Sequence, residues 1–259
     1  MKLITRRTLL ERGARMAGAV TVGLPLVSDA EAARAAGTQP TRKLKVVVAG
    51  AHPDKIEIGC GGTIARYADL GHEVVAIYLT KGERGLQGKT YDEAGKIRAA
   101  EAVKACEILK ARPVFAGQVN GKVEVNYAHY DEYRKILEVE NPDIVFSHWP
   151  LDSHEDQRAN FLLIYDAWLQ GKKKFALYFY EVMTGHFTLQ FTPTHYVDIT
   201  DTEPRKHQAC LAHASKDFQT LYASVQEVNV FRGHECGRKY AEGFIRHVQS
   251  PDESLPMMS

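Results

Sequence analysis

The residues best suited to chemistry form two short runs, of which the first begins at position 51. His52 and Asp54 directly follow an apolar segment at 44–49, and a glycine-rich stretch comes after them. An imidazole and a carboxylate placed together can supply a metal ligand and a general base for hydrolysis. In an open α/β sheet, the carboxyl end of a strand is where ligands bind. The run is therefore a candidate hydrolytic site, although a helix-capping role for Asp54 explains it equally well.

The second run, at 148–157, follows another apolar segment and is denser in ligand-type side chains. It contains His148, Asp152, His154 and Asp156. The last three are spaced two residues apart, which is unusual for a solvated loop without a task, so a functional role is favoured. Strand ends converge on one crevice in a doubly wound sheet, so residues about a hundred positions apart can share a site. We expect the two runs to do so.

Apolar runs alternate with helix signals along the chain and predict the elements that position these residues. Strands are expected at 43–50, 72–80, 113–116, 142–147, 175–182 and 195–199. Helices are expected at 63–70, 91–109, 130–139, 161–169 and 203–221. Strands that alternate with helices predict an α/β fold, with a mostly parallel sheet covered by helices on both faces in a single domain.

The amino terminus has the pattern of an export signal. Arg6 and Arg7 precede a mildly apolar stretch at 16–27, and Ala30-Glu31-Ala32 has the small-x-small form of a cleavage site. Paired arginines indicate the twin-arginine route, which predicts a periplasmic or extracellular protein. A retained membrane anchor is the alternative, but it would need about 20 strongly apolar residues.

These signals divide the chain into four parts. We expect an export signal at 1–32, a linker at 33–42, the α/β domain at 43–248 and a loose tail at 249–259, with no membrane span after the signal.

The charge balance limits the partners of the protein. Thirty-three basic and 32 acidic residues leave a formal charge of +1, which argues against nucleic acid as the main partner. The glycines near position 60 do not form a GxGxxG fingerprint, so no nucleotide cofactor is expected. The expected ligand is a small molecule or a glycan, and the sequence leaves a homo-oligomer open.

Taken together, these residues resemble the LmbE-like deacetylases, the family that includes the PIG-L N-acetylglucosaminyl deacetylases. AHPDKIEIGCGGT at 51–63 is similar to the family's AHPDD-x-E-x-G-C-G-G-T opening, and HWPLDSHEDQRAN at 148–160 to its HP-x-D-x-H-x-D-H-x-A segment. KGERG at 81–85 and the segment at 232–244 resemble two further motifs. The resemblance covers about 43–246. It implies a Rossmann-like α/β domain and metal-dependent removal of an acyl group, usually acetyl, from an amino sugar.

The resemblance also implies roles for the matching residues. His52 would be a zinc ligand, and Asp54 the general base that takes a proton from water. His154 would assist the tetrahedral intermediate or the leaving amine, and Asp156 would orient the His154 ring.

The other two zinc-ligand positions of the family hold different residues, Lys55 and Gln157. An ammonium does not ligate zinc unless it is deprotonated, and a neutral amide is a poor ligand. His52 would be left alone from the family's three ligands, so tight zinc binding is not expected.

Three explanations account for this double replacement. The Lys55 ammonium can take the place of the metal, hold Asp54 and stabilise an oxyanion. Alternatively, a relocated metal is bound by His52 together with neighbouring ligand-type residues, the substitutes being Glu57, His148, Asp152 and His154. The third explanation is a catalytically silent protein that keeps the groove and binds a glycan or a partner.

The remaining candidates concern the substrate. Arg84, Trp149 and Asp152 are predicted to bind it, Trp149 by stacking on a sugar. Arg84 and Arg98 can both meet an anionic or hydroxyl-rich substrate, although a surface salt bridge is the favoured interpretation for Arg98. The leading hypothesis is an exported hydrolase that removes an acyl group from an N-acylated sugar or related amide, with or without zinc. The alternative is the silent glycan-binding or partner-binding protein.

Overall fold

The structure is a computed structural model that describes residues 42–252 and Leu255. The predicted export signal at 1–32 and most of the predicted linker lie outside the described residues, so both stay predictions. Of the predicted tail, the described part is tied to the sheet, because Leu177 N donates to Ser250 Oγ at 2.9 Å. Within the described part, none of the helices combines the length and apolarity that a bilayer crossing needs.

A mostly parallel sheet forms the centre of the described region, as predicted. Its order is β3-β2-β1-β4-β5-β7-β6, and β7 pairs antiparallel with both of its neighbours. The bounds are β1 Lys45–Gly50, β2 Glu73–Thr80, β3 Arg112–Gln118, β4 Ile144–His148, β5 Ala176–Tyr180, β6 His195–Asp198 and β7 Ala241–Arg246. Because β1 and β4 are adjacent and parallel, the two runs of candidate residues leave the sheet side by side.

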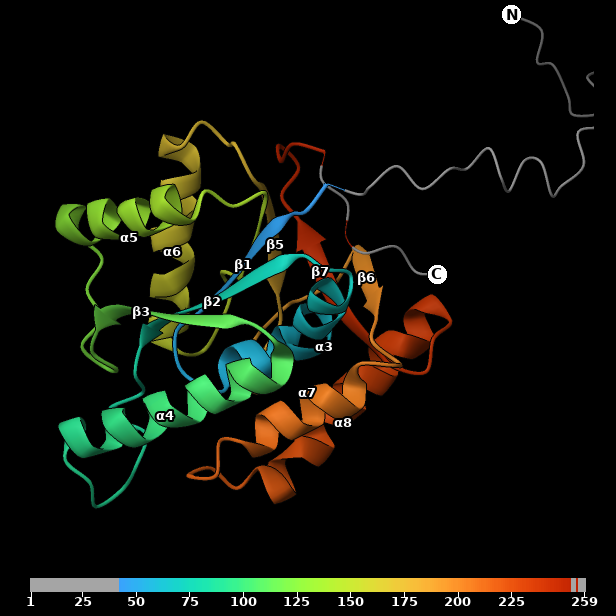
Figure 1. The fold of residues 1–259 in the computed structure, drawn as a ribbon, viewed down its shortest axis with the longest axis horizontal. Helices are drawn as coiled ribbons and strands as arrows, with labels where there is room; N and C mark the ends of the chain where they lie inside the picture. The colour runs from blue at the N-terminus through green and yellow to red at the C-terminus, as the bar shows by residue number, and fades with distance from the viewer. Residues whose placement is uncertain (1–41, 253–254, 256–259) are drawn as a thin grey trace, which may run out of the picture. The chain divides into compact units, whose positions relative to one another are not determined.

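Helices cover both faces of this sheet (Figure 1), again as predicted. On one face lie α3 Lys55–Asp69, α4 Tyr91–Leu109, α7 Glu203–Leu211 and α8 Phe218–Cys236, and on the other α5 Tyr127–Glu140 and α6 Glu155–Gln170. The side chains of β1 alternate between the two cores, since Val46 and Val48 enter one and Val47 and Ala49 the other. A strand covered on both faces needs such a continuous apolar run.

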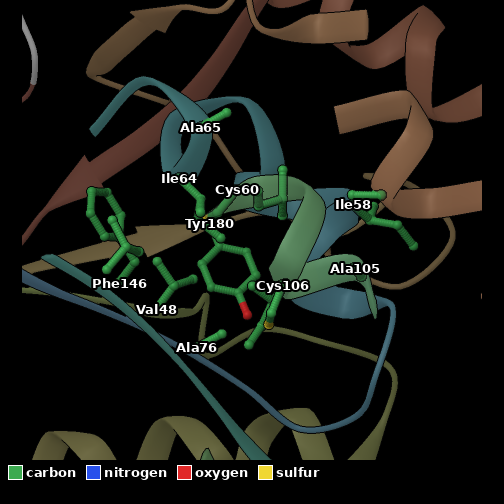
Figure 2. Close-up of a cluster of buried hydrophobic side chains, with 14 of the residues drawn as sticks. Val48, Ile58, Cys60, Ile64, Ala65, Ala76, Ala105, Cys106, Phe146 and Tyr180 are labelled. Atoms are coloured by element: carbon green, nitrogen blue, oxygen red, sulfur yellow. The ribbon is translucent and has the colours of Figure 1, made fainter. Parts of the chain in front are cut away.

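The larger core lies between the sheet and the group of four helices. Figure 2 shows Tyr180 of β5 in this core, surrounded by Val48, Phe146 and Cys60. Its hydroxyl donates to Ala49 O at 2.9 Å, so this buried polar atom is satisfied at the carboxyl end of β1.

Three helices begin earlier than the sequence predicted, α5 by three residues and two others by more. Helix α3 starts at Lys55 instead of 63, and α6 at Glu155 instead of 161. The glycine-rich stretch therefore lies inside α3, where glycines permit close packing. A Cβ on Gly62 would lie 2.6 Å from Ile199 Cβ. Candidate residues in both runs thus sit at helix starts, where their side chains are held rigidly.

The carboxy-terminal part differs most from prediction. The single helix expected at 203–221 is wrong, because α7 ends at Leu211 and α8 begins at Phe218, where Asp217 caps it by accepting from Thr220 N. Strand β7 was not predicted, since Glu242 and Gly243 interrupt its apolar pattern.

A buried ion pair explains how β7 tolerates Glu242. Its carboxylate accepts hydrogen bonds from Gly62 N at 3.0 Å and Thr63 N at 2.8 Å, and from Lys206 Nζ at 2.7 Å. Lys206, with 0% of its surface exposed, also donates to Asn229. The pair thereby joins α3, α7, α8 and β7.

Replacing Glu242 with glutamine is expected to destabilise the fold by about 3 kcal/mol. The substitution leaves the Lys206 ammonium buried without a counter-charge, and breaking one side of a buried pair typically costs about 3–5 kcal/mol. Urea unfolding followed by circular dichroism measures the change. Asp92→Asn, which breaks the exposed pair with Lys96, is the control and should cost less than about 1 kcal/mol. Equal losses in the two variants would contradict the role of the buried pair.

Candidate active site

The two runs of candidate residues meet at the carboxyl ends of β1 and β4. There they line a cavity of about 280 Å³, close to the lower end of small-molecule sites. From the runs themselves, the lining residues are His52, Asp54, Lys55 and His154. The other described lining residues are Arg84, Gly85, Arg98, Asn120, Gly121, Phe187 and Lys216.

Asp54 stands at the turn between β1 and α3 in an uncommon backbone conformation. Its φ is 89°, in the left-handed region that residues with a side chain rarely adopt and that costs of order 1–3 kcal/mol. Its carboxylate forms no helix cap. Instead, it pairs with Lys55 Nζ at 3.0 Å and Arg98 Nη2 at 2.9 Å. The helix-capping role considered for Asp54 is therefore wrong, and the strained turn aims its carboxylate at two cations.

Arg98 is the second of these cations, and the prediction of a surface role for it is wrong. Only 3% of its surface is exposed, and its Nη2 also donates to Pro53 O at 2.5 Å. Sequence periodicity places it on α4 but does not reveal that the turn at 51–54 packs against that helix.

The two cations set the charge state of Asp54. Burial raises its pKa, but the charges of Lys55 and Arg98 outweigh burial and hold the pKa well below its usual range. A carboxylate with such a low pKa is a weak proton acceptor near neutral pH. In this arrangement, Asp54 acts mainly as the counter-ion that positions Lys55.

Asp156 is held by three donors on a single oxygen. Its Oδ2 accepts hydrogen bonds from His52 Nε2, Asn120 Nδ2 and Gly121 N, each at 2.8 Å. Burial raises the pKa of Asp156, but these hydrogen bonds prevail and lower it to about 2. Burial also lowers the pKa of His52, and the nearby Lys55 charge adds to this effect. A neutral His52 therefore donates to an ionised Asp156.

Asn120 was missed by the sequence analysis. It follows β3 at the carboxyl edge of the sheet and is buried between His52 and Asp156. The Asn120-Gly121 pair after a strand was the available signal, because this pair marks a turn.

His154 is the imidazole best placed to act on a ligand. It precedes α6, and its Nδ1 accepts a hydrogen bond from Asp156 N at 3.2 Å. That nitrogen is therefore unprotonated, so the neutral ring carries its proton on Nε2. The side chain is 27% exposed and lines the cavity. The Nε2–H group can donate a hydrogen bond to a developing oxyanion.

Lys55 projects into the same cavity. Besides its pair with Asp54, its Nζ lies 4.6 Å from the centroid of the Phe187 ring. Gln157 is fully buried, and neither atom of its amide has a hydrogen-bond partner among the described residues.

The other candidates occupy different places. Arg84 lines the cavity, whereas Asp152 lies behind it and accepts hydrogen bonds from His154 N and Thr188 Oγ1. Trp149 packs against Phe179 and Phe191 and is not among the lining residues.

Glu57 and His148, the suggested substitute ligands, are both turned away from the cavity. Glu57 accepts a hydrogen bond from Tyr78 at 2.6 Å and pairs with His213 at 3.2 Å. The Nε2 of His148 accepts a hydrogen bond from Ala51 N at 3.0 Å. His148 therefore supports the turn after β1, whereas Glu57 joins α3 to β2 and to the segment between α7 and α8.

Comparison with known proteins identifies the family. A model of the PIG-L family, described as GlcNAc-PI de-N-acetylase, matches residues 47–168. The diacetylchitobiose deacetylase of Thermococcus kodakarensis is 31% identical over 225 residues, which cover 79% of this chain and 83% of that protein. The chain belongs to the PIG-L family. This confirms the family resemblance that the sequence motifs at 51–63 and 148–160 indicated.

Solved structures support the PIG-L fold. The N,N'-diacetylchitobiose deacetylase of Pyrococcus horikoshii superimposes with a TM-score of 0.72 at 24% identity, covering 80% of this chain and 84% of that one. The 4-carboxy-2-hydroxymuconate hydratase of Pseudomonas putida reaches 0.71 at 21% identity, covering 82% and 100%. Because one fold carries two reactions, the reaction must be argued from the site.

The site fits a divalent ion only in a shifted position. At the ligand positions implied by the PIG-L resemblance, the Lys55 ammonium and the Gln157 amide offer no suitable donors. His52, His154 and Asp156, however, each offer one ligand atom, and these atoms lie within 4.8 Å of one another. Two imidazoles and a carboxylate are a donor set that zinc and related ions accept.

Replacing Asp156 with asparagine is expected to lower stability at neutral pH by about 2 kcal/mol. The depressed pKa of Asp156 contributes stability that is fully present above its unfolded value near 4 and is lost as pH falls towards about 2. The difference in unfolding free energy between wild type and variant should therefore disappear as pH falls from about 4 to about 2. Urea unfolding at several pH values, with a chelator present, measures it.

The exposed Asp201→Asn is the matched control for this experiment and should follow wild type at every pH. A gap for Asp156→Asn that stays constant from pH 7 to pH 3 would show that its charge does not stabilise the site.

Proposed function

We propose that the protein is a hydrolase that removes an acyl group, with acetyl as the expected one, from the nitrogen of an amino sugar or related amide. Membership of the PIG-L family and the 31% identity to a diacetylchitobiose deacetylase support a deacetylase. The observation that carries the proposal is the arrangement of His52, Asp54, His154 and Asp156. These four matching residues form a single connected site at one cavity.

Hydrolysis of an amide places negative charge on the acyl oxygen and requires a proton for the leaving amine. The Nε2–H group of His154 can donate a hydrogen bond to the acyl oxyanion. The attacking water forms the new C–O bond and supplies the proton that leaves with the amine when the C–N bond breaks, so the His154 ring is neutral before and after the reaction. The Lys55 ammonium, held by Asp54, adds a fixed positive charge for the oxyanion. Asp156 keeps the His52 ring in place beside His154 by accepting from its Nε2, and Asn120 donates to the same Asp156 oxygen.

A divalent ion held by His52, His154 and Asp156 would add Lewis acidity towards the acyl oxygen. With such an ion bound, Nε2 of His154 would serve as a ligand instead of as a hydrogen-bond donor. Lys55 supplies one positive charge that belongs to the chain itself. The cavity therefore keeps a cation whether or not an ion is bound.

A second candidate function is binding of a glycan or partner without turnover. It is favoured by the state of Asp54, which two cations hold as a weak base. It is also favoured by the two substituted ligand positions, Lys55 and Gln157.

The proposed reaction predicts acetate release from N-acetylated sugars by the purified protein. His154→Ala should lower kcat by about 10²- to 10³-fold, because it removes the only imidazole proton that the geometry offers to the reacting atoms among the described lining residues. The assay is run with chelator and then with added zinc or nickel. His234→Ala, an exposed histidine at the end of α8, is the control and should retain wild-type kcat. No acetate under any of these conditions would overturn the proposal in favour of binding alone.

The assignment of the lost ligand positions predicts that Lys55→Asp with Gln157→His takes up zinc. The double variant restores a carboxylate and an imidazole beside His52, which completes a three-ligand site. Metal analysis after dialysis should find about one zinc per chain, and each single variant should retain less. A folded double variant that retains no more zinc than wild type would refute the placement of these ligands.

A further inference from the structure

The wall of the active-site cavity carries more positive than negative charge. Lys55, Arg84, Arg98 and Lys216 line it, whereas Asp54 is the one carboxylate among the described lining residues. We propose that this cavity binds an anionic group and that the substrate is an acidic N-acyl amino sugar. The identity of the reaction rests on the proposed function, but the charge of the ligand follows from the cavity itself.

Asp54 cannot neutralise all of the positive charge of the cavity, because its carboxylate is already shared between two cations. Its two oxygens pair with Lys55 at 3.0 Å and with Arg98 at 2.9 Å. One carboxylate therefore balances two cations. Asp156 lies nearby, but its Oδ2 is occupied by three donors and it is not among the lining residues.

Lys216 adds a third cation from the segment between α7 and α8. Its Nζ donates to the Gly85 carbonyl at 2.9 Å, which leaves two of the three ammonium protons for another acceptor. Of the acidic groups that act on Lys216, Asp54 is already shared by Lys55 and Arg98, and Glu101 accepts from Ser215 N and Ser215 Oγ. Burial lowers the pKa of Lys216, and the charge of Arg98 adds to this effect, as expected beside uncompensated positive charge.

Arg84 adds a fourth cation at the exposed edge of the cavity. No hydrogen bond or ion pair of its guanidinium is found among the described residues, although its backbone N donates to Asn120 Oδ1 at 3.2 Å. The side chain lies across Gly121, where a Cβ would be 2.8 Å from Arg84 Cδ. The acid next to it, Glu83, accepts from Asn120 N and Lys81 N instead.

The acidic groups of the described residues do not explain the positions of Arg84 and Lys216, although Lys216 also binds the Gly85 carbonyl. Arg98 and Lys55 hold Asp54, but Arg84 and Lys216 pair with no carboxylate among the described residues and still face the cavity. A guanidinium and an ammonium with free donors are the usual partners of carboxylate, sulfate or phosphate oxygens. Lys216 lies outside residues 47–168, the part of the chain that the family model matches.

Binding of three N-acetylated sugars tests the inference separately from turnover. Calorimetry on His154→Ala compares N-acetylglucosamine with N-acetylmuramic acid, which carries a carboxylate, and with N-acetylglucosamine 6-phosphate. At least one acidic sugar should bind about tenfold or more tightly than the neutral one, since a hydrogen bond to a charged group contributes about 1.5–3 kcal/mol. Added salt should weaken this preference, and the better acidic sugar identifies the anionic group.

Matched variants of His154→Ala locate the effect. Adding Arg84→Gln or Lys216→Met should each reduce the preference by threefold or more. Adding Lys174→Met is the control and should keep the preference, because that exposed lysine lies before the amino end of β5, whereas the cavity lies at the carboxyl ends of the strands. Equal or weaker binding of both acidic sugars would overturn the inference, even if the wild type deacetylates neutral sugars. Tight binding of an acidic sugar without acetate release by the wild type would instead overturn the proposed reaction and leave the inference standing.

Discussion

The ion pairs of Asp54 with Lys55 and Arg98 are the constraint on which the rest of the site depends. They hold the turn after β1 in a strained conformation, with a φ of 89° at Asp54, and they join this turn to α4 through the Pro53 carbonyl. All three side chains are largely buried, so removal of any one leaves a charge with an incomplete partner in a medium of low dielectric constant. The position of His52, which lies within the same turn, follows from this arrangement.

This constraint changes what a PIG-L site can do. A bound metal ion can leave or be exchanged, whereas the Lys55 ammonium is covalently part of the chain and carries a single charge. Asp54 is held as the counter-ion of two cations, and in the proposed reaction His154 serves as a hydrogen-bond donor through its Nε2–H group. A cavity with excess positive charge also selects its ligand by charge, because electrostatic interactions are stronger where water is partly excluded.

Much of the fold was predictable because its central strands are apolar on both faces. The runs that became β1, β2, β4 and β5 were recognised, as was the alternation with helices that implies a parallel sheet. Strand β7 and the division between α7 and α8 were not recognised. Glu242 and Lys206 look like surface residues in the sequence, and only their mutual contact across the fold makes their burial favourable. Local patterns do not contain such contacts.

At the site, the sequence alone determined the residue types: His52, Asp54, His154, Asp156, and the exchanged Lys55 and Gln157. It also predicted that both runs follow strand ends and share one crevice. Only the tertiary structure decided which groups face the cavity, bringing in Arg98, Asn120 and Lys216 and turning Glu57 and His148 into the core. The physical reason is that Coulombic and hydrogen-bond partners are chosen by distance in space. Residues remote in sequence therefore set the charge of each group, and no spacing rule reveals them.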